Sequence, residues 1–141
     1  MTVIGFSFTR MLVEKNNPVK GKVSINSNVG IKEVEETKLN INTAKKALKV
    51  NFEFVSVYDP NIGKISLEGE VVYLVDKDKS DETLKNWKKN KKLDQEMMNN
   101  ILNHVLAKCN IEALILSRDI NLPPPIPLPK VSDEKENKSA A

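Results

Sequence analysis

The sequence has only one cysteine, one histidine and five glycines. Because Cys109 stands alone, no disulfide can form within the chain, and one cysteine with one histidine cannot complete a zinc site. His104 and Cys109 are five residues apart, about 140° around a helix, so we expect no catalytic pair between them. The glycines are scattered singly, which excludes a glycine-rich phosphate loop. The sequence therefore predicts no catalytic residues, no metal site and no cofactor, and we expect a protein that is not an enzyme.

Long apolar runs are also absent. No stretch of about 18 apolar residues is present, so we expect no membrane insertion. The chain does not begin with a basic segment followed by an apolar one, so we expect no secretory signal. These absences favour a cytoplasmic protein. The 141 residues are enough for one domain, which we expect at 1–131, followed by a disordered polar tail at 132–141.

Alternation of apolar and polar residues gives the clearest structural signal, at 47–58 and 64–75. Turn-forming residues at 59–63 join these two segments, which predicts a β-hairpin. One face is apolar throughout, with Leu48, Val50, Phe52, Phe54, Ile65, Leu67, Val71, Tyr73 and Val75. The other face is polar except at Val55, Val57, Val72 and Leu74. The back of a one-sided sheet is normally polar, so these apolar positions predict contact with a partner.

Two further strands are predicted before this hairpin. The segment 3–14 alternates loosely, which places Phe6, Phe8 and Leu12 on one face and Val3, Met11 and Val13 on the other. The segment 22–41 is either one long bent strand or two short strands, with a bulge near Gly30. Together the four segments predict an antiparallel sheet.

Two helices and an extended segment follow the sheet. Ser80 or Asp81 is the predicted cap of a short helix that ends near Asn90, with Leu84 and Trp87 facing inward together. From Asp94, the predicted N-cap, apolar residues recur every three or four positions over about 24 residues, which predicts an amphipathic helix roughly 36 Å long. Its apolar positions are Met97, Met98, Ile101, Leu102, Val105, Leu106, Cys109, Ala113 and Leu116. That length exceeds what a small sheet needs for cover, so part of the helix is expected to pack against another subunit.

Five prolines at 123–129 exclude a helix and predict an extended strap. Leucine and isoleucine alternate with the prolines, which favours a strap lying on the domain's own apolar surface over a ligand for another protein's aromatic groove. The predicted fold is thus α+β: a four-stranded antiparallel sheet, a short helix, a long C-terminal amphipathic helix and a proline-rich strap.

This order of elements resembles the SecB-like chaperones. Residues 116–125 read Leu-Ser-Arg-Asp-Ile-Asn-Leu-Pro-Pro-Pro, similar to the Ser-Arg-Gly and the following proline- and leucine-rich segment of bacterial members, although Asp119 takes the place of the glycine. The hairpin, with Gly69 in mid-strand, also matches in spacing. The resemblance covers about residues 3–131 and is closer to archaeal, generally uncharacterised members than to bacterial ones.

The resemblance implies a holdase, which binds unfolded or partly folded polypeptides without ATP through apolar grooves between sheet and helix. The candidate client-binding residues are Phe6, Phe8, Phe52, Phe54, Val55, Val57 and Trp87. Among these, Phe52 and Phe54 are the best candidates for the core, whereas Val55, Val57 and Trp87 are expected to be exposed. The resemblance also implies a dimer or a dimer of dimers, with Met98, Leu102, Val105 and Cys109 of the long helix at the interface. The sequence leaves open whether such a holdase serves export, guards an antitoxin or acts in general proteostasis.

The net charge of the chain differs from that of bacterial export members. Two alternatives to the chaperone function also remain. Bacterial export members are acidic and dock a motor protein through acidic residues, whereas this chain has a net charge of +3, so motor docking is not expected. Five lysines gather around Trp87, at Lys85, Lys88, Lys89, Lys91 and Lys92. A nucleic-acid-binding module using this cluster is one alternative. The other is an oligomeric adaptor or structural protein that binds no client.

Overall fold

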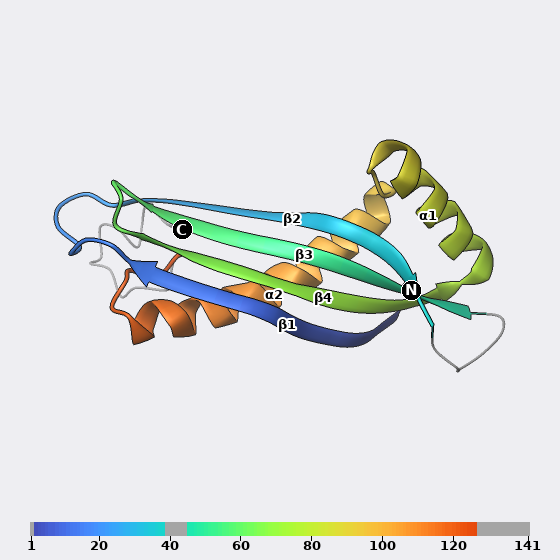
Figure 1. Cartoon of the computed structure of the whole chain (residues 1–141), viewed down its shortest axis with the longest axis horizontal. Coiled ribbons are helices and arrows are strands. Elements are labelled where there is room, and N and C mark those ends of the chain that lie inside the picture. The colour runs from blue at the N-terminus through green and yellow to red at the C-terminus, as the bar shows by residue number, and fades with distance from the viewer. Residues whose placement is uncertain (1, 39–44, 127–141) are drawn as a thin grey trace, which may run out of the picture.

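The computed structural model describes residues 2–38 and 45–126. Its elements are the strands β1 (Thr2–Lys15), β2 (Ser24–Thr37), β3 (Lys45–Asp59) and β4 (Gly63–Asp76), and the helices α1 (Lys77–Asn90) and α2 (Gln95–Asp119). The strands form one antiparallel sheet in the order β1-β4-β3-β2 (Figure 1). The predicted α+β class and the predicted four-stranded sheet are confirmed.

The central strands β3 and β4 form the predicted hairpin, paired from Lys45 opposite Asp76 to Tyr58 opposite Gly63. Their shared apolar face is the core of the domain, because alternate residues of a strand point to the same side. Eight of these side chains are at most 1% exposed, namely Leu48, Val50, Phe52, Phe54, Tyr58, Ile65, Leu67 and Val71. The hairpin was predictable because both strands alternate without interruption.

The edge strands depart from strict alternation. In β1 the pairing with β4 shifts between Val3 and Gly5 and again between Phe8 and Arg10. Each bulge adds one unpaired residue and so reverses the face of every later side chain. The predicted division of β1 into two faces is therefore wrong: Val3, Phe6, Phe8, Met11 and Val13 lie on the core face, opposite Tyr73, Val71, Gly69, Leu67 and Ile65, and Leu12 lies on the other face.

Strand β2 is one continuous strand with a register shift between Ile31 and Glu33, which confirms the long-strand alternative and the bulge near Gly30. The last residues of the predicted segment, from 39 to 41, lie outside the described part of the chain. Both edge strands thus carry a bulge at the same level of the sheet, since Phe8, Gly69, Phe52 and Ile31 are paired in one row. Bulges increase the local twist.

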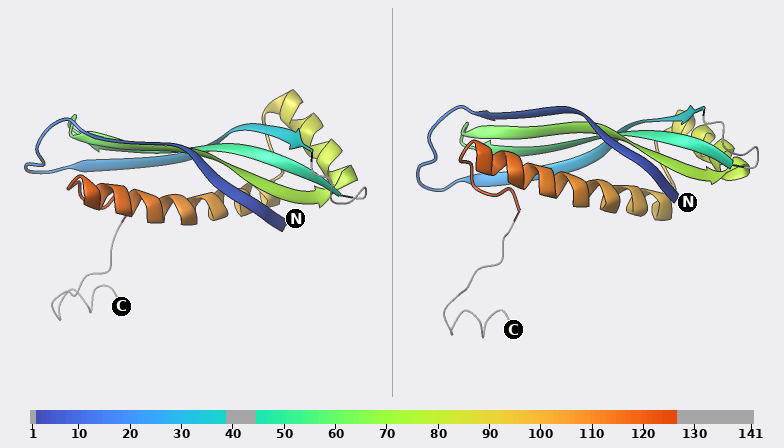
Figure 2. Two further views of the ribbon diagram at one scale, coloured as in Figure 1. Left: turned by 60° about the horizontal axis from the view of Figure 1, so that its bottom comes forward. Right: turned by 90° about the horizontal axis from the view of Figure 1, so that it is seen from below.

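Helix α2 covers one face of the sheet and leaves the other open (Figure 2). Its buried residues are spaced four apart, at Met97, Ile101, Val105, Cys109, Ala113 and Ser117. A spacing of four instead of 3.6 moves the contact line gradually around the helix, so that it follows a twisted sheet. The predicted cap is confirmed, because the Asp94 carboxylate accepts a hydrogen bond from the Met97 backbone N–H at 3.2 Å. This bond is the main cause of the lowered pKa of Asp94.

Helix α1 begins at Lys77, three residues before Ser80 and four before Asp81. Its N-cap residue Asp76 makes no side-chain capping bond within the described part of the chain. The prediction of Ser80 or Asp81 as the cap is wrong; Ser80 is instead buried inside the helix. Leu84 and Trp87 pack together against the core, as predicted. The helix ends at Asn90, near the predicted end, and the C-cap residue Lys91 adopts a left-handed conformation with φ 55°.

The segment after α2 packs on the domain, as predicted for the strap. Leu122 is 6% exposed and Pro125 is buried, and the Tyr58 hydroxyl donates a hydrogen bond of 2.6 Å to the Pro123 carbonyl. The strap beyond Ile126 and the predicted tail at 132–141 lie outside the described residues. Across the described ranges, neither helix is long and apolar enough to cross a bilayer.

Candidate functional site: an apolar strip between β1 and α2

Three of the four phenylalanines gather where β1 passes α2. The ring of Phe6 stacks on Phe52 with centroids 5.3 Å apart and meets the edge of Phe8 at 5.1 Å. On the helix side, His104 lies 5.7 Å from Phe6, and Lys108 Nζ lies 6.0 Å above the same ring, within the range of a cation–π contact. Phe6 and Phe8 are only half-buried, because β1 is an edge strand with no neighbour beyond it.

Strand β1 and helix α2 run side by side in the same direction (Figure 2). Phe6 meets His104 near one end, and Lys15 Nζ donates a hydrogen bond of 3.3 Å to the Asn121 carbonyl at the other. Met11 lies between these two contacts, on the core face of β1. It is nevertheless 45% exposed, because the sheet ends at β1 and no segment within residues 2–38 and 45–126 covers it.

The matching side of α2 carries two polar residues followed by two exposed isoleucines. His104 and Lys108 are four residues apart and both face β1; Ile111 and Ile115 continue the same stripe at the next helical spacings. Ile111 is 60% exposed and Ile115 is 38% exposed. We call Phe6, Phe8, Met11, Ile111 and Ile115 the β1–α2 strip. Exposed apolar side chains on two neighbouring elements make this strip a candidate interaction site.

Six of the seven predicted client-binding residues divide into three groups. Phe6 and Phe8 lie in the strip. Phe52 and Phe54 are 0% and 1% exposed and belong to the core, so neither is accessible to a client in this conformation. The two valines lie on the open face, where Val55 is half-buried and Val57 is 37% exposed.

Trp87, expected to be exposed, is buried. It is 4% exposed, and its indole N–H donates a hydrogen bond of 2.7 Å to the Glu33 carboxylate. This bond is the main cause of the lowered pKa of Glu33. The indole anchors α1 to the sheet, so it offers no face on which a nucleic-acid base could stack. A nucleic-acid-binding module at this cluster would therefore have the lysines but not the Trp87 ring for stacking.

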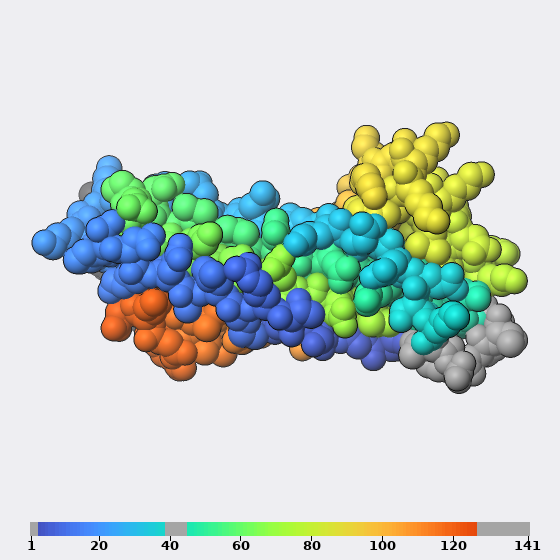
Figure 3. Space-filling model, viewed as in Figure 1, coloured from blue at the N-terminus to red at the C-terminus, as the bar shows by residue number. Residues whose placement is uncertain are grey.

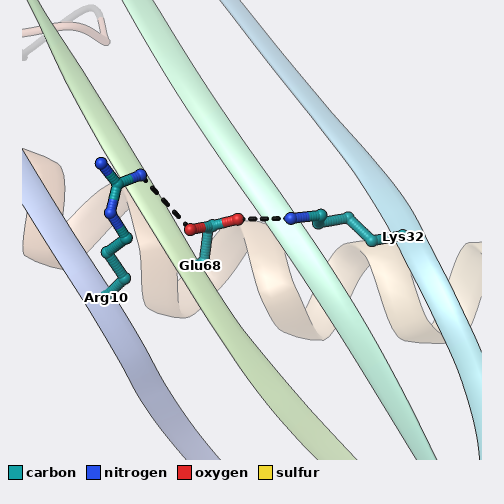
Figure 4. A network of polar contacts seen from close by, with 3 residues as sticks. All are labelled: Arg10, Lys32 and Glu68. Atoms are coloured by element: carbon teal, nitrogen blue, oxygen red, sulfur yellow. Dashed lines mark hydrogen bonds and ion pairs between the residues drawn. The ribbon is translucent and has the colours of Figure 1, made fainter.

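The open face of the sheet carries an ion network across its centre (Figure 4). Glu68 on β4 pairs with Arg10 on β1 at 3.3 Å and with Lys32 on β2, which reaches across β3. The hydrogen bond from Lys32 is the main cause of the lowered pKa of Glu68, and the same bond raises the pKa of Lys32. A shallow hollow of about 330 Å³ adjoins this network. The network separates the apolar residues near the hairpin, Val55 and Val57, from those near α1, so this face has no continuous apolar surface.

Two of the four predicted interface residues cannot meet another subunit. Val105 and Cys109 are 0% exposed because they face the sheet of their own chain, so their prediction as interface residues is wrong. Burial also raises the pKa of the Cys109 thiol to about 12, which leaves it unreactive at neutral pH. Met98 and Leu102 are half-buried and are not among the side chains that pack against the core, so they keep apolar surface to offer.

Three residues of the strip were missed from the sequence: Met11, Ile111 and Ile115. The signal for the isoleucines was present, since they follow His104 at spacings of seven and eleven, but their proximity to β1 needed the fold. Met11 was assigned to the wrong face because the bulges in β1 carry no clear signature. For catalysis, the described residues contain no group of three or more His, Cys, Asp or Glu side chains arranged to hold a metal ion.

Comparison with solved structures finds the same arrangement of sheet and helices elsewhere. The SecB-like chaperone Rv1957 of Mycobacterium tuberculosis, solved in complex with a ChAD peptide from the Rv1956 HigA1 antitoxin, superposes with a TM-score of 0.52. The alignment covers 94% of this chain and 91% of that chain. The chain has a SecB-like fold. Sequence identity is 10%, and neither a model of a known protein family nor a curated protein matches by sequence.

Proposed function

We propose that this protein is an ATP-independent chaperone that holds unfolded polypeptide segments on the β1–α2 strip. The observation that carries the proposal is the exposure of Met11, Ile111 and Ile115 beside the half-buried rings of Phe6 and Phe8. A folded monomer gains by covering such surface. An extended client segment would cover it along the length over which β1 and α2 run together.

The similar chaperone of known structure supports a polypeptide as the ligand, because it was solved with a peptide from an antitoxin. From that comparison we infer only that this chain also binds polypeptide segments. Whether the clients are exported proteins, antitoxins or unfolded proteins in general is open. A cytoplasmic location and the absence of enzymatic activity belong to the same proposal.

Self-association is the second part of the proposal. Met98 and Leu102 are apolar, only half-buried and not packed on the core. Pairing α2 with the α2 of a second copy would cover them, which supports a homo-oligomer. An adaptor that oligomerises without binding clients would share this property, so only a client assay separates the two functions.

Suppression of aggregation tests the proposal. A client protein diluted from denaturant is followed by light scattering with increasing amounts of the purified chain. We expect suppression near a one-to-one ratio, and M11S/I111S should remove most of it. The matched control is V19S/V57S, which also removes two exposed apolar side chains but lies outside the strip. No suppression by the native chain at several-fold excess, or equal loss in both variants, would contradict the proposed function.

A further inference from the structure

Helix α1 carries a concentrated positive charge on its outer side. Lys85, Lys88 and Lys89 follow the spacing i, i+3 and i+4, which gathers side chains on one side of a helix, and Lys92 lies two residues after the helix ends at Asn90. All four are exposed, and none lies within 4 Å of a carboxylate of the described residues, whereas six other lysines are paired, at Lys32, Lys45, Lys46, Lys49, Lys79 and Lys91. We call these four residues the α1 lysine stripe.

The anchoring of α1 turns this stripe outward. Ser80, Thr83 and Trp87 are buried on the inner side of the helix, and the Trp87–Glu33 hydrogen bond fixes its C-terminal half against the sheet. The stripe lies on the opposite side. Figures 1 and 3 show α1 projecting from the end of the sheet, where a partner can approach it without touching the rest of the domain.

Acidic residues limit the stripe at its other end. Asp78, Asp81 and Glu82 occupy the first turns of the same outer side, as is favourable near a helix N-terminus. The free positive surface therefore extends only over the last two turns and Lys92, about 10 Å at 1.5 Å per residue. A nucleic-acid strand, which carries a phosphate at every nucleotide, would run onto these carboxylates. A short cluster of carboxylates in an otherwise uncharged polypeptide segment would not.

We propose that the α1 lysine stripe docks a short acidic segment of a partner polypeptide. Charge complementarity and the length of the stripe fit about three or four carboxylates within one extended segment, at about 3.3 Å per residue. The surface is separate from the β1–α2 strip and goes beyond the proposed function, so a client and an acidic partner would bind together. The contacts are exposed ion pairs, so the affinity should fall steeply as salt is added.

Fluorescence anisotropy with defined probes tests this docking surface on the full chain. The probes are a labelled peptide with four glutamates between Gly-Ser segments, the same peptide with glutamines, and a single-stranded oligonucleotide of equal charge. The variant is K85Q/K88Q/K89Q/K92Q; its matched control, K20Q/K22Q/K38Q/K64Q, removes the same charge from other exposed lysines. Circular dichroism verifies that both variants keep their helices.

We expect the glutamate peptide to bind the native chain at low salt, the stripe variant to bind about tenfold more weakly, and the control to change affinity less than twofold. The glutamine peptide should not bind. Equal weakening in both variants would show a mere effect of net charge and overturn the proposal. So would an absence of glutamate-peptide binding, or tighter binding of the oligonucleotide. Client suppression should be unchanged in the stripe variant, so this result is independent of the chaperone proposal.

Discussion

The ring of Phe52 lies over the backbone of Gly69, its cross-strand partner. A Cβ at Gly69 would lie 2.7 Å from Cζ of that ring and would also strike the Ser7 carbonyl oxygen. On the other side Gly69 pairs with Phe8, whose ring meets Phe52 edge to face at 6.1 Å. The missing side chain therefore lets aromatic rings from β1 and β3 meet across β4, at the row where both edge strands bulge.

Substitution of this glycine tests how tightly the row is packed. G69A should lower the free energy of unfolding by about 2 kcal/mol, as is usual when atoms are forced into a filled core. The matched control is G30A, also in mid-strand, where an added Cβ has nothing within 4 Å and should change stability by less than about 0.5 kcal/mol. Urea titration measures both. Equal effects would mean that the glycine matters for its backbone and not for the ring above it.

The Tyr58 hydroxyl is the hydrogen-bond donor that holds the strap. Y58F removes its bond to Pro123 and should cost about 1 kcal/mol in urea unfolding, with faster proteolysis after Leu122. Y73F is the natural comparison, because the Tyr73 hydroxyl is buried without a hydrogen-bond partner among the described residues and its loss should be neutral or stabilising. Burial raises the pKa of Tyr58 to about 12, so the strap should stay in place through pH 10. If Y73F lowered the free energy of unfolding more than Y58F did, this role of the Tyr58 hydroxyl would be refuted.

The bond between Trp87 and Glu33 should make the docking of α1 sensitive to acid. The pKa of Glu33 is lowered in the folded protein, so the bond stabilises above the ordinary value of 4.5 and is lost as the pH falls below it through the folded pKa. Trp87 is the only tryptophan, so its emission should shift to the red in that range. E33Q should abolish the pH-dependent part of the shift, and E35Q, on the same strand, should retain it. An unchanged titration in E33Q would exclude this bond as the cause.

Self-association through α2 predicts a solution mass that is a multiple of the chain's 15.9 kDa. M98K/L102K places charges at the two half-buried positions and should lower the mass measured by light scattering, because burying unpaired charges is costly. N99K/N103K adds the same charges to exposed positions one residue further along and should leave the mass unchanged. If the native chain had a solution mass of 15.9 kDa, or if both variants dissociated alike, Met98 and Leu102 would not form an interface.

The sequence was sufficient for the elements whose periodicity is uninterrupted. The β3–β4 hairpin and α2 repeat their apolar positions over 12 to 25 residues, and Asp94 signals where the helix starts. The faces of the β1 side chains were predicted wrongly because the bulges after Val3 and Phe8 depend on pairing with β4, which is about 60 residues away in sequence.

The candidate site was predicted only in part, for a related reason. Phe6 and Phe8 were identified as apolar residues on a predicted strand, but exposure depends on which strand ends the sheet and where α2 lies across it. The order β1-β4-β3-β2 puts Phe52 in the centre and Met11 at the border. Trp87 was predicted both to face inward with Leu84 and to be exposed to a client; in the fold it is buried, and its indole N–H donates to Glu33.

Site-specific cross-linking tests the central claim most directly. Because Cys109 is fully buried, a single cysteine introduced by Met11→Cys or Ile111→Cys can be labelled with a benzophenone while Cys109 stays unmodified. The labelled chain is mixed with a reduced and alkylated protein that cannot refold, and then irradiated. We predict cross-links to this client from positions 11 and 111, and few from the matched Val19→Cys and Val57→Cys. Cross-links from positions 19 and 57 that equal or exceed those from the strip would contradict the account.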